Sequence, residues 1–379
     1  ESIGEIGMRF SYLTLAASPG PESDWQAIQD QLELARLAEQ LGFDGVWLTE
    51  HYFTGESVYN DALTFAAAVA MQTSKLRIGF AVVQLPFHHP VRLATQLALL
   101  DNLSNGRIDV GVGKGTVFNE YEFVGHGLRS DDSRARAAEA QTILERCFAG
   151  EPFSFKGDYY DLSVPALRPK PVQISGPPIW RSVISPPSFS DAGRQGLPIL
   201  TARLPVSRIR ERWDLYREGM DAGGIGAEKQ SALLQQSGIW RNLYVAESDA
   251  QAEDELADAL RHARRHMIHI RQELNPDDFV VDPAVLSPWV DPSADEESAI
   301  TDAVQSGSIC GGPQRVKGQI EELRDAGVGH VVLQTTFGDM AHGQTVSAME
   351  RFGTDAIRSK RHVSHLSPTL FPYSIERFQ

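Results

Sequence analysis

Cysteine and runs of basic residues are both scarce in this sequence. Among 379 residues there are only two cysteines, Cys147 and Cys310, and neither has neighbours at the spacing of a metal site or a disulfide framework. The formal net charge is −15, and Lys and Arg nowhere form a run, which argues against nucleic acid or an anionic membrane as the main partner. We therefore expect a cytoplasmic protein in a reducing compartment.

Long hydrophobic stretches are also missing. No segment is long and apolar enough to span a membrane. The beginning of the chain, Met8–Ala17, is too short and too polar for a signal peptide and is more typical of a first strand. We leave residues 1–7 out of the fold prediction, and we expect no membrane partner.

What the chain does contain is a regular alternation of short apolar runs and amphipathic helical segments. Eight such units favour a closed barrel of parallel strands over an open sheet, so we predict an α/β fold, a (β/α)8 TIM barrel, as a single domain over residues 8–379. The predicted strands are Met8–Leu15, Asp44–Leu48, Leu76–Val83, Arg107–Gly113, Pro178–Ile184, Leu197–Ala202, Ile239–Val245 and Gly329–Thr335.

Two segments interrupt the alternation. Residues 150–177, between the fourth and fifth predicted strands, are rich in Pro, Gly and aromatic residues. Residues 274–308, after the seventh strand, contain several prolines and acidic residues with scattered apolar ones. We interpret both as insertions into the barrel rather than as linkers between domains.

A polar cluster, Thr49–Tyr52, follows the second predicted strand directly. Catalytic groups of (β/α)8 barrels lie at the carboxyl ends of the strands, so this cluster predicts an active site with His51 and Glu50 as catalytic candidates. We expect His51 to handle protons with a pKa near neutrality, and Glu50 to orient His51 or a backbone turn. The alternative for His51 is a packed core histidine.

Two further motifs follow this cluster along the chain. One is Leu85–Arg92, with Leu-Pro before His89-Pro-Val-Arg, and the other is Leu99–Arg107, with Leu-Leu-Asp, Ser and Gly-Arg. Together with Thr49–His51, they make the chain resemble the bacterial luciferase-like flavin-dependent monooxygenases from Met8 to about Arg358. The resemblance implies a TIM barrel that receives reduced FMN from a separate flavin reductase. It also implies the use of O2 to insert one oxygen atom into a small organic substrate, by hydroxylation or Baeyer–Villiger chemistry.

The resemblance also implies where the flavin binds. Its phosphate would be held by a basic residue after the fourth strand, an Arg at the next helix start and two hydroxyls after the fifth strand, which are Lys114, Arg134, Ser185 and Ser188 here. Lys114 replaces an Arg of the luciferases and loses the planar fork of donors. Ala81-Val82 falls where the family has a non-prolyl cis peptide beneath the flavin ring.

Other implications concern light emission, closure and assembly. Gly113 and Ile184 stand where the luciferase catalytic subunit has a reactive Cys and a Glu, which argues against light emission on a long-chain aldehyde. Residues 274–308 correspond to the lid that shields the reduced flavin. Members of the family commonly dimerise through the second and third helices, so we expect a homodimer.

Several alternatives remain open at this point. One is a deazaflavin-dependent dehydrogenase on the same barrel, and another is a non-catalytic flavin-binding relative or the supporting subunit of a heterodimer. We expect no metal site, since His88 and His89 are adjacent residues with no further ligand at a suitable spacing. A predicted helix carries three histidines on one face, at His262, His266 and His269. They lie among arginines, so we expect a solvated basic face there rather than a metal site.

Overall fold

A closed barrel of eight parallel strands forms the centre of the computed structural model, which describes residues 7–281 and 286–358. The strands follow one another around the barrel in the order β1-β2-β3-β4-β7-β8-β9-β11, and β11 pairs with β1 to close it. They are β1 (Arg9–Thr14), β2 (Gly45–Leu48), β3 (Arg77–Gln84), β4 (Ile108–Gly113), β7 (Ile179–Ser182), β8 (Ile199–Ala202), β9 (Gly238–Val245) and β11 (His330–Gln334). The predicted TIM barrel is confirmed, while residues 359–379 of the predicted domain and 282–285 of the predicted lid lie outside the described residues.

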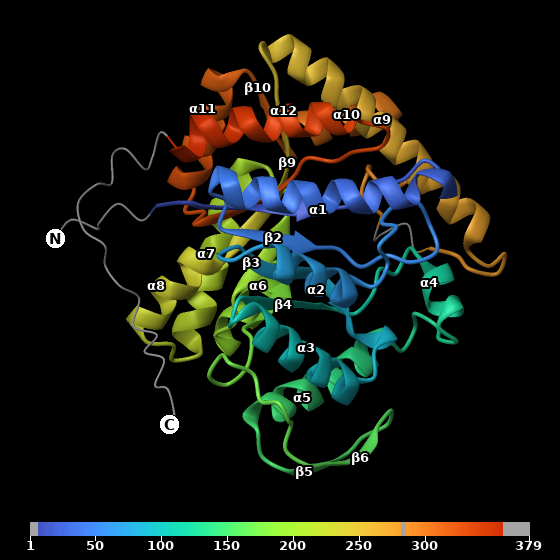
Figure 1. Ribbon diagram of the computed structural model, residues 1–379, viewed down its shortest axis with the longest axis vertical. Helices are drawn as coiled ribbons and strands as arrows, with labels where there is room; N and C mark the ends of the chain where they lie inside the picture. The colour runs from blue at the N-terminus through green and yellow to red at the C-terminus, as the bar shows by residue number, and fades with distance from the viewer. Residues whose placement is uncertain (1–6, 282–285, 359–379) are drawn as a thin grey trace.

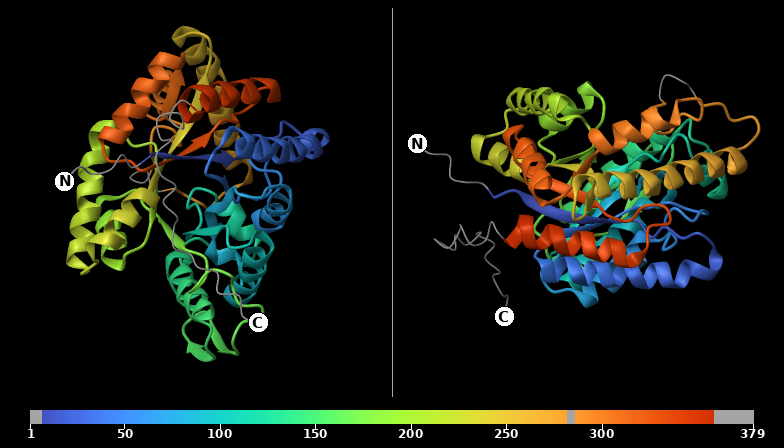
Figure 2. Two further views of the ribbon diagram at one scale, coloured as in Figure 1. Left: turned by 60° about the vertical axis from the view of Figure 1, so that its left-hand side comes forward. Right: turned by 90° about the horizontal axis from the view of Figure 1, so that it is seen from above.

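Helices surround the barrel on its outer side (Figures 1 and 2). Most of them connect one strand to the next, as expected for β-α units. They are α1 (Asp24–Leu41), α2 (Ala62–Gln72), α3 (Pro90–Ser104), α4 (Glu120–Gly125), α5 (Ser133–Ala149), α6 (Pro186–Gln195), α7 (Val206–Ala222), α8 (Ala227–Gln236), α9 (Asp249–Leu274), α10 (Glu296–Gln305), α11 (Pro313–Asp325) and α12 (His342–Phe352). Short 3-10 turns lie at Pro21–Ser23 and Leu85–Phe87, and a π-helical turn at Gly353–Arg358.

Two tryptophans fill the middle of the barrel. The rings of Trp47 and Trp180 meet edge to face with centroids 4.7 Å apart, and both side chains are buried. Glycine makes room for them, because a Cβ on Gly79 would lie 2.5 Å from the Trp47 ring. The interior is therefore packed rather than hollow, and a ligand must bind at an end of the barrel.

The two predicted insertions contain regular structure that the sequence patterns did not reveal. Residues 150–177 include an antiparallel hairpin of β5 (Phe153–Lys156) and β6 (Asp161–Val164), which packs on α5. There Arg146 of α5 stacks on Phe153, with its guanidinium carbon 4.3 Å from the ring centroid. The second segment contains α10 and leads into β10 (Ser308–Gly311), which pairs with the carboxyl half of β9. β10 contains only two apolar residues, Ile309 and Cys310, next to glycines, so it shows no apolar run that would predict a strand.

Within residues 7–281 and 286–358, no helix combines the length and the apolar character that crossing a membrane requires.

Candidate active site at the carboxyl end of the barrel

The second strand brings Glu50 and His51 to the carboxyl end of the barrel. Gly42 ends α1 in the left-handed conformation, at φ +90°, and donates to the carbonyls of Ala38 and Glu39. The chain then enters β2, whose four residues are all buried between β1 and β3. Glu50 and His51 follow immediately.

Glu50 ties the end of β2 to the end of β3. Its side chain is buried and accepts hydrogen bonds from Tyr52 Oη, from His88 Nε2 at 2.6 Å and from the backbone N–H of Gln84 at 2.5 Å. Its own carbonyl accepts from Gln84 Nε2 at 2.6 Å. Glu50 forms no hydrogen bond with His51, so of the two roles expected for it, orienting His51 or orienting a backbone turn, its contacts suit the second.

Two carboxylates face His51 instead. Its Nδ1 lies 3.3 Å from Glu122 Oε1, and its Nε2 lies 3.8 Å from Glu56 Oε1. Burial alone would lower the pKa of His51, but Glu56 and Glu122 outweigh it and raise the pKa to about 9. The expected value near neutrality is therefore wrong, and His51 carries a proton at neutral pH.

Glu122 is the residue that sequence reasoning missed here. It lies on α4, is fully buried, and accepts a 2.9 Å hydrogen bond from the backbone N–H of Tyr52, while its Oε2 has no hydrogen-bond partner among the described residues. Arg271 of α9 is close enough to interact with it electrostatically. The only available signal was an acidic residue between the aromatic Tyr121 and Phe123, in the stretch that follows the fourth predicted strand.

His88 belongs to the same region, although the sequence suggested no function for it. Burial favours its neutral form, but the hydrogen bond to Glu50 prevails and raises its pKa. The carboxyl end of β2 and β3 thus holds two histidines, each against a buried carboxylate.

The four predicted phosphate ligands follow two neighbouring strands. Val112 of β4 pairs with Arg181 of β7, so Lys114 after β4 and Ser185 after β7 lie at the same edge of the barrel. Burial and then the neighbouring Arg134 guanidinium lower the pKa of Lys114. Within the described residues, neither Lys114 nor Arg134 forms an ion pair with a carboxylate.

The hydroxyls of this group lie at the start of α6. Ser185 is its N-cap residue, and Ser188 Oγ donates a 2.6 Å hydrogen bond to the carbonyl of Ser185. Pro186 and Pro187 have no N–H, so the first turn offers fewer backbone donors than most helix starts. Two exposed cations and a serine at one edge suit a phosphate group, which needs positive charge and hydrogen-bond donors.

The Ala81-Val82 peptide bond lies in β3 and is cis. The register between β3 and β4 shifts between Phe80 and Val83. Glycines of β4 make room for this backbone, because a Cβ on Gly113 would lie 2.5 Å from Val82 Cγ2. Ala81 packs against the cluster that contains Trp47 and Trp180, so it forms part of an apolar surface at the mouth of the barrel.

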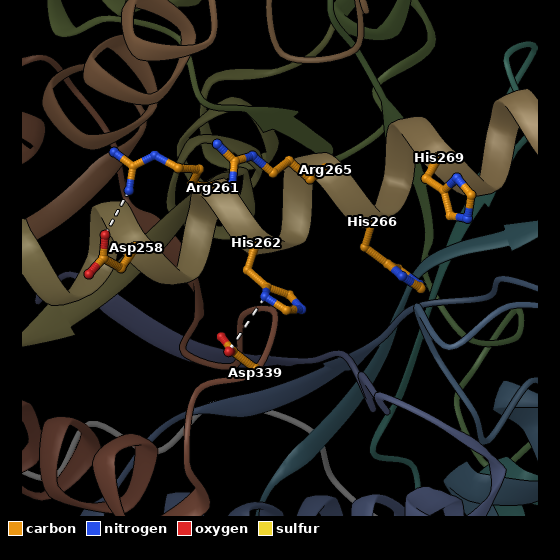
Figure 3. Close-up of a pocket in the computed structure, with 7 residues that line it drawn as sticks. All are labelled: Asp258, Arg261, His262, Arg265, His266, His269 and Asp339. Atoms are coloured by element: carbon orange, nitrogen blue, oxygen red, sulfur yellow. Dashed lines mark hydrogen bonds and ion pairs between the residues drawn. The ribbon is translucent and has the colours of Figure 1, made fainter.

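The three histidines of α9 line an open hollow of about 630 Å³, together with arginines and aspartates (Figure 3). His262 Nδ1 lies 3.5 Å from Asp339 Oδ2, and Arg261 pairs with Asp258 at 2.7 Å. In the part of the chain that the structure describes, three candidate metal ligands meet only at Asp30, Glu33 and His342, on the outer side of the barrel. The α9 histidines do not form such a group.

Comparison with known proteins decides the family. The model of the family described as luciferase-like monooxygenase matches residues 8–330. The chain belongs to this family. The predictions of a luciferase-like barrel and of an enzyme of the monooxygenase class are thereby confirmed.

Individual members of the luciferase-like monooxygenase family align over nearly the whole chain. Limonene 1,2-monooxygenase of Rhodococcus erythropolis is 28% identical over 354 residues, which cover 92% of this chain and 85% of that enzyme. The crystal structure of monooxygenase RslO1 from Streptomyces bottropensis has a TM-score of 0.78 and 26% identity, and the match covers 93% of this chain and all of RslO1.

More distant structures share the fold alone. They include 3,6-diketocamphane monooxygenase from Pseudomonas putida with FMN, at a TM-score of 0.71 and 20% identity, covering 92% of this chain and 97% of that one. They also include an F420-dependent secondary alcohol dehydrogenase, at a TM-score of 0.66 and 19% identity, covering 93% and 98%. The fold therefore accommodates both flavin and deazaflavin cofactors.

Proposed function

We propose that this protein is a two-component monooxygenase, which receives reduced FMN from a separate reductase and inserts one atom of O2 into a small organic substrate. The observation that carries the proposal is the pair Lys114 and Arg134, two neighbouring cations without a carboxylate partner among the described residues, at the edge expected to hold the flavin phosphate. When bound, the reduced flavin would supply the electrons that activate oxygen.

The residues of this chain would bind and orient the flavin. Lys114 and Arg134 would attract the phosphate, and the Ser185 hydroxyl would donate a hydrogen bond to it; the Ser188 hydroxyl would do so by giving up its bond to the Ser185 carbonyl. The surface that includes Ala81 and Val82 would lie under the ring. This arrangement divides binding between a charged end and an apolar end, which fixes the direction of the ligand.

His51 would handle the proton of the reaction. β2 and β3 are neighbours, so His51 follows the strand next to the one that carries Ala81. With its pKa raised to about 9, His51 is a cationic donor, suited to stabilise negative charge that develops on oxygen. Glu50 would act through His88 and the backbone of β3 rather than on the substrate.

Anaerobic titration with reduced FMN and with reduced riboflavin tests the cofactor proposal. Because riboflavin lacks the phosphate, we expect FMN to bind at least about tenfold more tightly, a difference of about 1.4 kcal/mol. Arg134→Met should remove most of the difference, and Lys156→Met on the exposed hairpin should preserve it. Equal affinities for the two flavins in the unaltered protein would refute the phosphate site.

Oxygen incorporation tests the reaction itself. We expect flavin bound to the protein to reoxidise more slowly than free flavin on mixing with air, and labelled oxygen from 18O2 to appear in a product. Reoxidation at the rate of free flavin, with no label in any product, would contradict the monooxygenase proposal.

A second candidate is a deazaflavin-dependent dehydrogenase, which is favoured by the shared fold of the F420-dependent alcohol dehydrogenase. It predicts tighter binding of F420 than of FMN, and alcohol oxidation without oxygen. A non-catalytic flavin-binding relative predicts flavin binding with neither reaction. A titration with F420 beside that with FMN, together with the oxygen experiment, separates all three.

We also propose a homodimer formed through α2 and α3. Met71 on α2 is 69% exposed, and Leu99 and Leu103, one turn apart on α3, are 50% and 45% exposed. Because α2 and α3 pack against each other, these exposed apolar side chains suit an interface. Sedimentation velocity should give a dimer that Leu99→Glu converts to a monomer. A cytoplasmic location stays a prediction, to be tested by cell fractionation.

A further inference from the structure

A partly open cavity lies at the mouth of the barrel, on the side opposite the proposed phosphate site. It has a volume of about 130 Å³ and lies over the ends of β1, β8, β9 and β11, beneath α9. Apolar side chains, among them Met267, Trp289 and Phe337, form much of its wall. The polar groups that line it include Arg203 and Glu56.

Arg203 is the residue that determines what this cavity can bind. It follows β8 directly, and its backbone has φ +24°, a strained value for a side chain other than glycine. Its guanidinium carbon lies 4.5 Å from the ring centroid of Trp240 and 5.1 Å from that of Trp289. Among the described residues, its five N–H donors have no hydrogen-bond acceptor and no ion-pair partner.

The surroundings of Arg203 leave its charge largely uncompensated. Burial lowers its pKa to about 10, and Asp302, the one carboxylate that acts on it, opposes that shift without pairing with it. Arg241 lies close by and is itself buried, and its Nη1 has no hydrogen-bond partner among the described residues. The Arg203 side chain is only partly buried, and its position between two indole rings at the wall of the cavity leaves its donors available to a ligand that supplies an acceptor.

Glu56 connects the cavity to the candidate active site. It lines the cavity and lies 3.8 Å from His51 Nε2. Glu56 also acts electrostatically on His266, a further cavity residue, although burial dominates there and lowers the pKa of His266. A ligand held at Arg203 would therefore extend toward His51, with its charged end away from the carboxylates.

We propose that Arg203 binds the carboxylate of the organic substrate, and that the substrate is a small acid with a single ring. The planar guanidinium can donate two parallel hydrogen bonds to a carboxylate, which a neutral group cannot accept with equal strength. A closed cavity of about 150 Å³ holds benzene, so this partly open one of about 130 Å³ limits the ligand to about one ring. The term substrate rests on the proposed monooxygenase function, whereas the binding of the acid does not.

Titration of the flavin-free protein with benzoate tests this assignment. Trp240 and Trp289 line the cavity, so we expect saturable quenching of tryptophan fluorescence by benzoate and much weaker quenching by benzamide, its uncharged counterpart. Arg203→Met should raise the benzoate Kd at least tenfold. Arg203→Lys, which keeps the charge but loses the fork, should give an intermediate value, and Arg208→Met on exposed α7 should leave the Kd unchanged.

Three outcomes would overturn the assignment. They are benzoate binding that Arg203→Met does not weaken, benzamide binding as tight as that of benzoate, and loss of reduced FMN affinity in Arg203→Met with benzoate binding intact. Thermal melting of each variant shows that it is folded, and Arg203→Lys answers the question if Arg203→Met unfolds. Benzoate binding without flavin binding would refute the proposed function and retain this site, so the two failures are distinguishable.

Discussion

Two edges of the same barrel mouth carry opposite kinds of charge. At the ends of β2 and β3, Glu50 is buried and fixed by several hydrogen bonds, and the buried Glu122 of α4 accepts from the Tyr52 N–H, while the histidines lie against these carboxylates. At the ends of β4 and β7, Lys114 and Arg134 are exposed and have no ion-pair partner among the described residues. The charged groups of the first edge have partners within the protein, although Glu122 Oε2 accepts no hydrogen bond from the described residues, whereas the cations of the second edge have no carboxylate partner there. Under the proposed function, this difference would separate groups that perform chemistry from groups that bind a ligand.

Replacing the proton-handling residue should have the largest effect. His51→Gln keeps a hydrogen-bonding side chain but cannot carry a proton, and general acid–base groups contribute about 10² to 10⁴ in rate. We expect product formation to fall by that factor, measured as kcat with saturating reduced FMN. The Kd of FMN should be unchanged, and a comparable loss of FMN binding would show that His51 is a binding residue instead.

Glu50→Gln should have the second largest effect, and it should act mainly on the stability of the fold. The amide would bring N–H groups toward the donors of Gln84, His88 and Tyr52, and a buried group that loses its partner costs about 1–3 kcal/mol. Urea denaturation should show a loss of this order in the free energy of unfolding. Glu247→Gln, at an exposed ion pair with Arg351, is the matched control and should change it by less than about 1 kcal/mol.

A pH profile of activity distinguishes His51, with its raised pKa, from a histidine with an ordinary pKa. If protonated His51 is the active form, activity should fall as pH rises through about 9. The raised pKa of His51 also stabilises the folded state. This stabilisation is fully present at pH values below 6.5, the ordinary pKa of histidine, and is lost as the pH rises through about 9. Glu56→Gln removes one of the carboxylates that raise the pKa of His51, so the loss of activity at alkaline pH should begin at a lower pH. If this loss does not move, it reports the titration of another group.

We expect the smallest effect from replacing Lys114, one of the exposed cations that follow β4. Lys114→Met should weaken FMN binding by no more than about tenfold, because solvent screens an exposed charge and Arg134 remains. The loss should shrink further in 0.5 M salt, at which FMN affinities of the unaltered protein and the variant converge. A salt-independent loss would mean that Lys114 contacts the flavin in a dry environment.

Much of the barrel could be predicted because its strands are short apolar runs followed by polar residues. β2 shows this pattern clearly, and the polar residues after its apolar run led to the prediction of Glu50 and His51. β10 could not be found, since Ser308–Gly311 contains only two apolar residues and its pairing with β9 arises only in the folded chain. The limit was the lack of an apolar run rather than element length, because β2 also has four residues.

The charge state of the site could not be predicted in the same way. The pKa of His51 depends on Glu122, which is 71 positions away and arrives on α4. Arg203 was overlooked as well, although its place after a predicted strand was a signal that the barrel rule offers. That it lacks an acceptor is visible only once Trp240 and Trp289 are in place around it.

The tryptophan pair inside the barrel has a spectroscopic consequence. Trp47 on β2 and Trp180 on β7 come from strands on different sides of the barrel, yet their rings are 4.7 Å apart at a fixed interplanar angle of 77°. Two indoles held this closely couple their electronic transitions and should give a strong near-ultraviolet circular dichroism signal. Because that signal requires fixed tertiary packing, it reports closure of the barrel from within, independently of any cofactor.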